Sequence, residues 1–96
     1  VALNNADIIE KSLDDIFQIT FDYALMSEVM NTLKKIEIEM VSQDFGNIGK
    51  IKIAIPKSDL EEKMILIKAG IAKVRVEEVA DLEEIEGVEI DYLFTR

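Results

Sequence analysis

Cationic and neutral polar side chains alternate with apolar ones in three segments of this sequence, at residues 17–21, 50–55 and 72–79. If these segments are neighbouring strands of one sheet, their outward positions form a single surface of six residues: Lys50, Lys52, Lys73, Arg75, Gln18 and Thr20. Lysine and arginine on such a surface hold phosphate groups and position a nucleic acid without reading its sequence. RNA-binding sheets also stack bases on aromatic side chains, which these positions lack. We therefore expect phosphate contacts with weak sequence preference.

Two acidic side chains on a neighbouring segment offer a second interpretation of the same lysines. Residues 36–40 alternate as a strand, and this strand would place Glu37 and Glu39 opposite Lys50 and Lys52. Surface ion pairs of this kind contribute about 0 to 1 kcal/mol each. The lysines therefore fit either a binding surface or a row of structural ion pairs.

Groups for covalent or acid–base catalysis cannot be assembled from this sequence. It contains no His and no Cys, and none of its four serines has a base partner or a glycine elbow around it. The acidic pairs at 77–78 and 83–84 lack the spacing of a calcium-binding loop, and adjacent acids usually form a solvated face. Gly46 and Gly49 have the spacing of a hairpin and not of a phosphate-binding loop. We expect a protein that is not an enzyme and that has no metal site and no cofactor.

The formal net charge of −9 would disfavour nucleic acid if it were spread evenly, because polyanions attract Lys and Arg. Residues 1–75 hold 12 acidic and 10 basic side chains, a balance of −2, whereas residues 76–96 hold 8 acidic side chains against one arginine, a balance of −7. The acidity therefore belongs to the C-terminal end. No apolar run approaches the roughly 20 residues that span a bilayer, so we expect a cytoplasmic protein with no membrane partner.

The elements that would position the six-residue surface follow a repeated pattern. An alternating strand, a helix start and an amphipathic helix occur at residues 17–33 and again at 50–70, and a further strand follows each helix. Ser58 and Glu61 form a capping box for the second helix, and Gly70 is placed to end it. The sequence therefore predicts a ferredoxin-like α+β sandwich with the element order βαββαβ. Its antiparallel sheet has the strand order 4-1-3-2 and carries two helices on one face.

The residues on either side of this domain are predicted separately. Residues 1–11 look like the end of a helix from a preceding domain, residues 12–79 form the sandwich, and residues 80–96 form an acidic turn and an additional strand along an exposed sheet edge. Five apolar side chains are candidates for contacts with the missing N-terminal domain, with another protein or with a second copy in a homodimer: Ile65, Leu66, Val88, Ile90 and Tyr92. Packing between the two helices is an alternative use of the first two.

Several short pieces of the sequence resemble one known family. They are Asp22-Tyr-Ala-Leu, Asp44-Phe-Gly46, Ile53-Ala-Ile-Pro56 and Ala69-Gly70. Together they resemble the C-terminal domain of the IMPACT (YigZ-like) family, which is similar to the last domain of elongation factor G, over about residues 1–78. The Arg-Tyr-Phe-Gly-Gly signature of the family's N-terminal domain does not occur in this chain, and residues 79–96 exceed the family's usual ending.

The resemblance implies a non-catalytic accessory domain that binds RNA or a ribosome-associated translation component, and the six-residue surface is the expected site. A protein-interaction module that self-associates through the last strand is the main alternative. A small-molecule regulatory domain of the amino-acid-sensing type is a third candidate, although the strand-to-helix junction Phe21-Asp22-Tyr23 lacks the glycine that such sites use.

Overall fold

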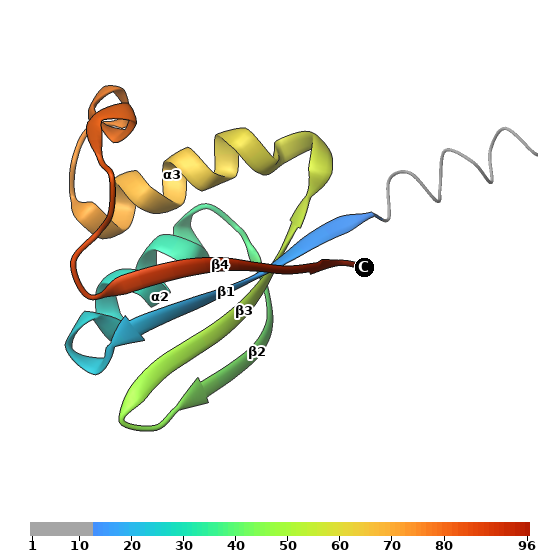
Figure 1. The fold of residues 1–96 in the computed structure, drawn as a ribbon, viewed down its shortest axis with the longest axis horizontal. Coiled ribbons are helices and arrows are strands. Elements are labelled where there is room, and N and C mark those ends of the chain that lie inside the picture. The colour runs from blue at the N-terminus through green and yellow to red at the C-terminus, as the bar shows by residue number, and fades with distance from the viewer. Residues whose placement is uncertain (1–12) are drawn as a thin grey trace, which may run out of the picture.

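The computed structural model describes residues 13–96, so the helix expected at residues 1–11 lies outside the described part. The elements follow one another along the chain as β1 (Asp14–Asp22), η1 (Tyr23–Leu25), α2 (Met26–Lys35), β2 (Glu39–Phe45), β3 (Ile48–Pro56), η2 (Lys57–Asp59), α3 (Leu60–Ala72), η3 (Val76–Asp81) and β4 (Val88–Thr95), where η denotes a 3-10 helix. The two α-helices pack on the same face of the sheet (Figure 1).

The sheet is antiparallel with the strand order β2-β3-β1-β4. This order and the placement of the helices confirm the predicted ferredoxin-like α+β architecture. Apolar side chains from alternate positions of the strands meet those of the helices in one core, whose fully buried members are Ile19, Phe21, Val29, Leu33, Ile51, Ile53, Ile55 and Ile67. Within residues 13–96, no helix is both long and apolar enough to cross a lipid bilayer.

The strand beside β1 is not formed by the predicted segment, and this prediction was wrong. Residues 72–79 contain the end of α3 and the start of η3, whereas β4 at Val88–Thr95 occupies the edge next to β1. The additional C-terminal strand is therefore the fourth strand of the sandwich. A domain bounded at residue 79 lacks this strand.

Gly70 explains why the helix was predicted to end too early. Instead of ending α3, it lies inside the helix and against α2, where a Cβ atom at Gly70 would be 2.5 Å from Cγ2 of Thr32. The glycine thus permits close helix packing. The helix ends at Lys73, which adopts the left-handed conformation (φ 58°), and the N–H of Val74 donates to the carbonyl of Ala69.

Helix α2 also ends with a left-handed residue that is not glycine, and the second strand therefore begins later than predicted. Glu37 has a φ of 57°, and the N–H groups of Glu37 and Ile38 donate to the carbonyls of Lys34 and Leu33. These two bonds form a Schellman motif in which the left-handed residue is not glycine. The predicted strand at 36–40 was therefore wrong in its bounds, since β2 begins at Glu39.

Candidate protein-interaction site along strand β4

The open face of the sheet brings together four of the six predicted surface residues. The β1–β3 register pairs Gln18 with Lys52 and Thr20 with Lys50. On β2, Ser42 and Asp44 lie opposite the same two lysines. The expected ion pairs from Glu37 and Glu39 are absent among residues 13–96, where neither lysine takes part in an ion pair.

Lys73 and Arg75 do not lie on this face, and their predicted place was wrong. Lys73 follows α3, and its Nζ atom is 3.5 Å from Oε1 of Glu28 on α2. Arg75 precedes η3, and its Nη2 atom is 3.0 Å from Oε1 of Glu78. Both are exposed cations in surface ion pairs, which contribute little to stability.

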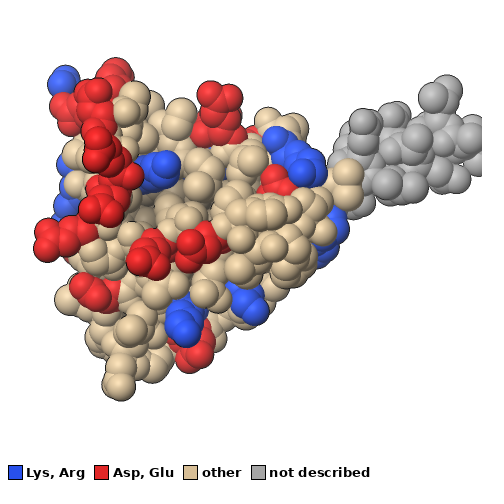
Figure 2. All heavy atoms as spheres, in the orientation of Figure 1, with Lys and Arg blue, Asp and Glu red and all other residues tan. Residues whose placement is uncertain are grey.

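Carboxylates from β4 occupy the places where these two cations were expected. The β1–β4 register sets Asp91 beside Gln18 and Glu89 beside Thr20. The open face therefore carries two lysines on β3 and two acids on β4. Figure 2 shows further acidic side chains gathered over the segment between α3 and β4, at the upper left of the view.

Strand β4 forms an edge of the sheet, and part of its backbone has no strand partner in the described residues. It pairs with β1 on one side, and on the other side Val88 forms a bridge with Ile85, so about half of the N–H and C=O groups from Glu89 onward point away from the sheet. Its last residues expose large apolar side chains: Tyr92 is 56% exposed, Leu93 37% and Phe94 53%. Such an edge is a template for pairing with another strand.

Three of the five predicted interaction residues lie on β4, and the other two lie on α3. Val88 is buried at 8% exposure and belongs to the core, whereas Ile90 is half-buried. Tyr92 is exposed, and its ring packs edge-on against Phe17 with 5.5 Å between the ring centroids. Ile65 and Leu66 are half-buried on α3.

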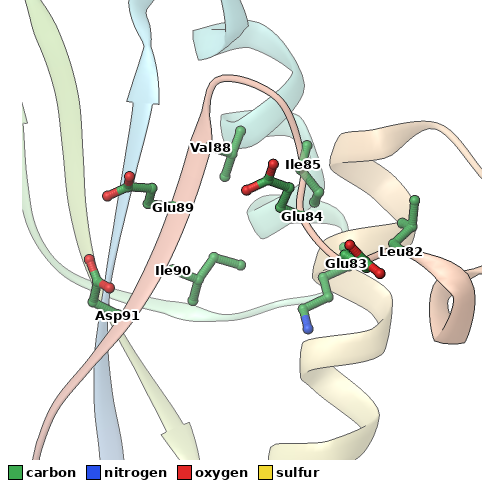
Figure 3. Close-up of a pocket in the computed structure, with 9 residues that line it drawn as sticks. Leu82, Glu83, Glu84, Ile85, Val88, Glu89, Ile90 and Asp91 are labelled. Atoms are coloured by element: carbon green, nitrogen blue, oxygen red, sulfur yellow. The ribbon is translucent and has the colours of Figure 1, made fainter.

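A cleft adjoins the outer side of β4. It has a volume of about 260 Å³, and its lining residues come from α3, from the segment before β4 and from β4 itself: Lys68, Leu82, Glu83, Glu84, Ile85, Val88, Glu89, Ile90 and Asp91. Figure 3 shows Ile90 pointing from β4 toward α3, whereas Glu89 and Asp91 point to the opposite side of the strand. The lining thus combines aliphatic side chains with Lys68, Glu83 and Glu84, whereas the carboxylates of Glu89 and Asp91 lie on the other side of the strand.

Backbone contacts at Gly87 hold the wall of this cleft in place. Gly87 has a φ of 79°, which suits glycine, and its carbonyl accepts a hydrogen bond of 3.0 Å from the N–H of Asp22. The N–H of Val88 donates to the carbonyl of Ile85 at 3.1 Å. These bonds tie the segment before β4 to the end of β1.

A buried carboxylate fixes the other end of β4. Oδ1 of Asp15 accepts hydrogen bonds from Nζ of Lys57 at 2.9 Å and from Oγ1 of Thr95 at 2.7 Å, and Thr95 also contacts the hydroxyl of Tyr92 at 2.8 Å. The hydrogen bonds from Lys57 and Thr95 lower the pKa of Asp15, although burial opposes them. The carboxylate therefore stays charged at neutral pH and anchors the exposed end of the strand.

Comparison with known protein families, with curated proteins and with solved structures finds no match. The resemblance to the IMPACT family therefore stays a prediction. The shape and chemistry of this domain are the grounds for its functional assignment.

Apart from Val88 and Ile90, the cleft residues were not predicted as part of a site. The sequence shows Leu82 and Ile85 three residues apart among acids, which is a helical spacing, and these acids were interpreted as a solvated face. Their role becomes visible only when β4 is placed beside β1. Within the described residues, no group of three or more Asp or Glu side chains is arranged to hold a metal ion.

Proposed function

We propose that this chain is a non-catalytic protein-interaction domain that binds an extended segment of a partner protein along the free edge of β4. The main support for this proposal is that β4 is an edge strand. Its last residues expose Tyr92, Leu93 and Phe94 beside unpaired backbone groups. In strand addition, main-chain hydrogen bonds supply affinity, and alternate side chains of the added strand supply specificity. The hydrogen bonds of Asp15 hold the end of this edge in an extended conformation before binding, which lowers the entropic cost of association.

The other edge of the sheet is less suited to this role. Strand β2 also exposes apolar side chains, but its central residues Ser42, Gln43 and Asp44 are all polar and exposed. Strand β2 therefore lacks a run of exposed apolar side chains like Tyr92, Leu93 and Phe94 on β4. The two edges nevertheless contain a matched pair of positions, because Leu93 and Val41 are each the extra residue at a register shift, with 37% and 44% exposure.

This matched pair provides the test. Eight-residue peptides, the length of β4, are selected from an unbiased display library on the full chain, and their affinities are measured by fluorescence polarisation. We expect Leu93→Lys to weaken the selected peptides about three- to sixfold, because a fully buried leucine is worth about 1.5 to 3 kcal/mol, only 37% of this side chain is still exposed and can be buried on binding, and 1.4 kcal/mol is tenfold. The control Val41→Lys is expected to bind as the wild type does. Failure to select any peptide, or equal losses for the two variants, would reject the proposal.

RNA binding through the open face is a second candidate, favoured by the exposed and adjacent Lys50 and Lys52 beside Gln18 and Thr20. It also follows from the family resemblance. The neighbouring Glu89 and Asp91 weaken it, since they lie on the same face. Two phosphate contacts would give a slope of about −1.4 for log affinity against log salt concentration.

A salt-dependent titration with single-stranded RNA separates this candidate from the first. If the open face binds RNA, the double variant Lys50→Glu and Lys52→Glu loses the salt-dependent affinity, whereas the control Lys34→Glu and Lys35→Glu, on the exposed end of α2, retains it. Identical titrations of the two double variants would remove this candidate without affecting the proposal for β4.

A further inference from the structure

The cleft beside β4 and the carboxylates on the open face specify what the added strand should contain. We infer that the partner segment alternates apolar residues with Lys or Arg. This inference rests on the proposed function and names the chemistry of the ligand for the same edge. It depends on the two sides of β4 being chemically different.

On the helix side of β4, the added strand would meet aliphatic side chains. Ile90 points toward α3, and Leu82 and Ile85 line the same cleft (Figure 3). Successive side chains of a strand point to opposite faces, so every second residue of a strand paired with β4 faces this cleft. A cavity of about 150 Å³ already admits a benzene-sized group, and the cleft of about 260 Å³ is therefore large enough for an aliphatic side chain.

On the open-face side, the intervening residues of the added strand would meet Glu89 and Asp91. Within residues 13–96, neither carboxylate takes part in an ion pair, and the same holds for Glu83 and Glu84 at the cleft. Opposite charges at facing positions of neighbouring strands stabilise the pairing, and like charges destabilise it. Lysine or arginine at every second position of the ligand therefore complements this side.

The same charges disfavour the expected homodimer through β4. Pairing of β4 with a second copy along Val88–Asp91 would bring the carboxylates of Glu89 and Asp91 close to the same two residues of the other copy. Like charges at such positions are destabilising. A basic segment of another protein meets no such repulsion. It is therefore a better partner for this edge than a second copy of the chain.

The experiment uses two synthetic peptides of eight residues, one alternating valine and lysine and one alternating valine and glutamate. Each is titrated into the full chain, into Glu89→Lys/Asp91→Lys, and into the control Glu62→Lys/Glu77→Lys, whose exposed positions lie outside the cleft. The control receives the same change of charge. Cooperative thermal unfolding of both variants verifies that they are folded, and Leu93→Lys is included as the test of the edge itself.

We expect wild type and control to prefer the lysine peptide, and Glu89→Lys/Asp91→Lys to bind it about five- to tenfold more weakly, as estimated for two facing charge pairs. The same variant should bind the glutamate peptide more tightly than wild type does. Equal loss in the control would show attraction by net charge alone and overturn the inference. If wild type binds both peptides equally well and Leu93→Lys binds them more weakly, the inference about basic residues is overturned. The proposal that β4 is the docking edge is then retained. Binding that Leu93→Lys leaves unchanged would reject both.

Discussion

Removing residues 88–96 is expected to abolish the cooperative unfolding transition of this domain. Strand β1 pairs with β4 at seven positions, from Asp15 with Thr95 to Phe21 with Val88. Their loss exposes the backbone of a central strand and one side of the core. A small domain has a total stability of only about 5 to 15 kcal/mol, so it is not expected to survive the loss of a strand. Thermal unfolding followed by circular dichroism, together with amide dispersion in NMR spectra, measures the effect.

Two point variants show whether the loss comes from packing on the core. Ile90→Ala should lower the free energy of unfolding by about 1 to 3 kcal/mol, because the half-buried side chain contacts the core cluster. Glu89→Ala, at the exposed neighbouring position, should change it by less than about 0.5 kcal/mol. A truncated chain that melts like the full chain would mean that another segment pairs with β1.

Gly49→Ala is expected to destabilise the domain by about 1 to 3 kcal/mol, the usual cost of overpacking a core. Gly49 is buried on β3, and a Cβ atom there would enter the van der Waals radius of the Phe21 ring, which is itself only 1% exposed. The ring cannot withdraw without disturbing its neighbours, because the core is close-packed. Chemical denaturation measures the loss in the free energy of unfolding. The two proteins are compared at the same dependence of this free energy on denaturant concentration.

Gly46→Ala is the matched control for this variant. It lies in the hairpin between β2 and β3, where an added Cβ atom would meet no other atom within 4 Å, and it is not among the residues with a positive φ. The change should therefore be within about 0.5 kcal/mol of wild type. Equal effects at the two glycines would show that Phe21 does not pack over Gly49 as described.

The architecture could be predicted because its signals are local and repeated. The alternation at Phe17, Ile19 and Phe21 recurs at Ile51, Ile53 and Ile55, and all six side chains face the helices, Phe17 at the margin of the core. The helix ends could not be predicted with the same certainty, because Glu37 and Lys73 adopt a left-handed conformation that usually indicates glycine. Gly70 has the opposite role, since it marks close helix packing.

Ile90 and Tyr92 were predicted on an edge strand, but the charges around this edge could not be predicted, because they depend on which segment lies beside β1. Val74 and Val76 alternate with Lys73 and Arg75 as a strand would, so local pattern favoured residues 72–79. In the structure, β4 pairs with β1 instead of this segment. The pairing places Glu89 rather than a cation beside Thr20. The open face therefore carries two carboxylates at the positions where two cations were predicted.

Titration of the valine–lysine peptide into the isotopically labelled full chain, followed by amide chemical shifts, tests most directly whether β4 is the docking edge. We predict that the largest shifts fall on Val88–Thr95 and on the cleft residues Leu82–Ile85. Slowed amide exchange of β4 should accompany them, since strand addition pairs its free N–H groups. Largest shifts along β2, or at Lys50 and Lys52 without change in β4, would contradict the account.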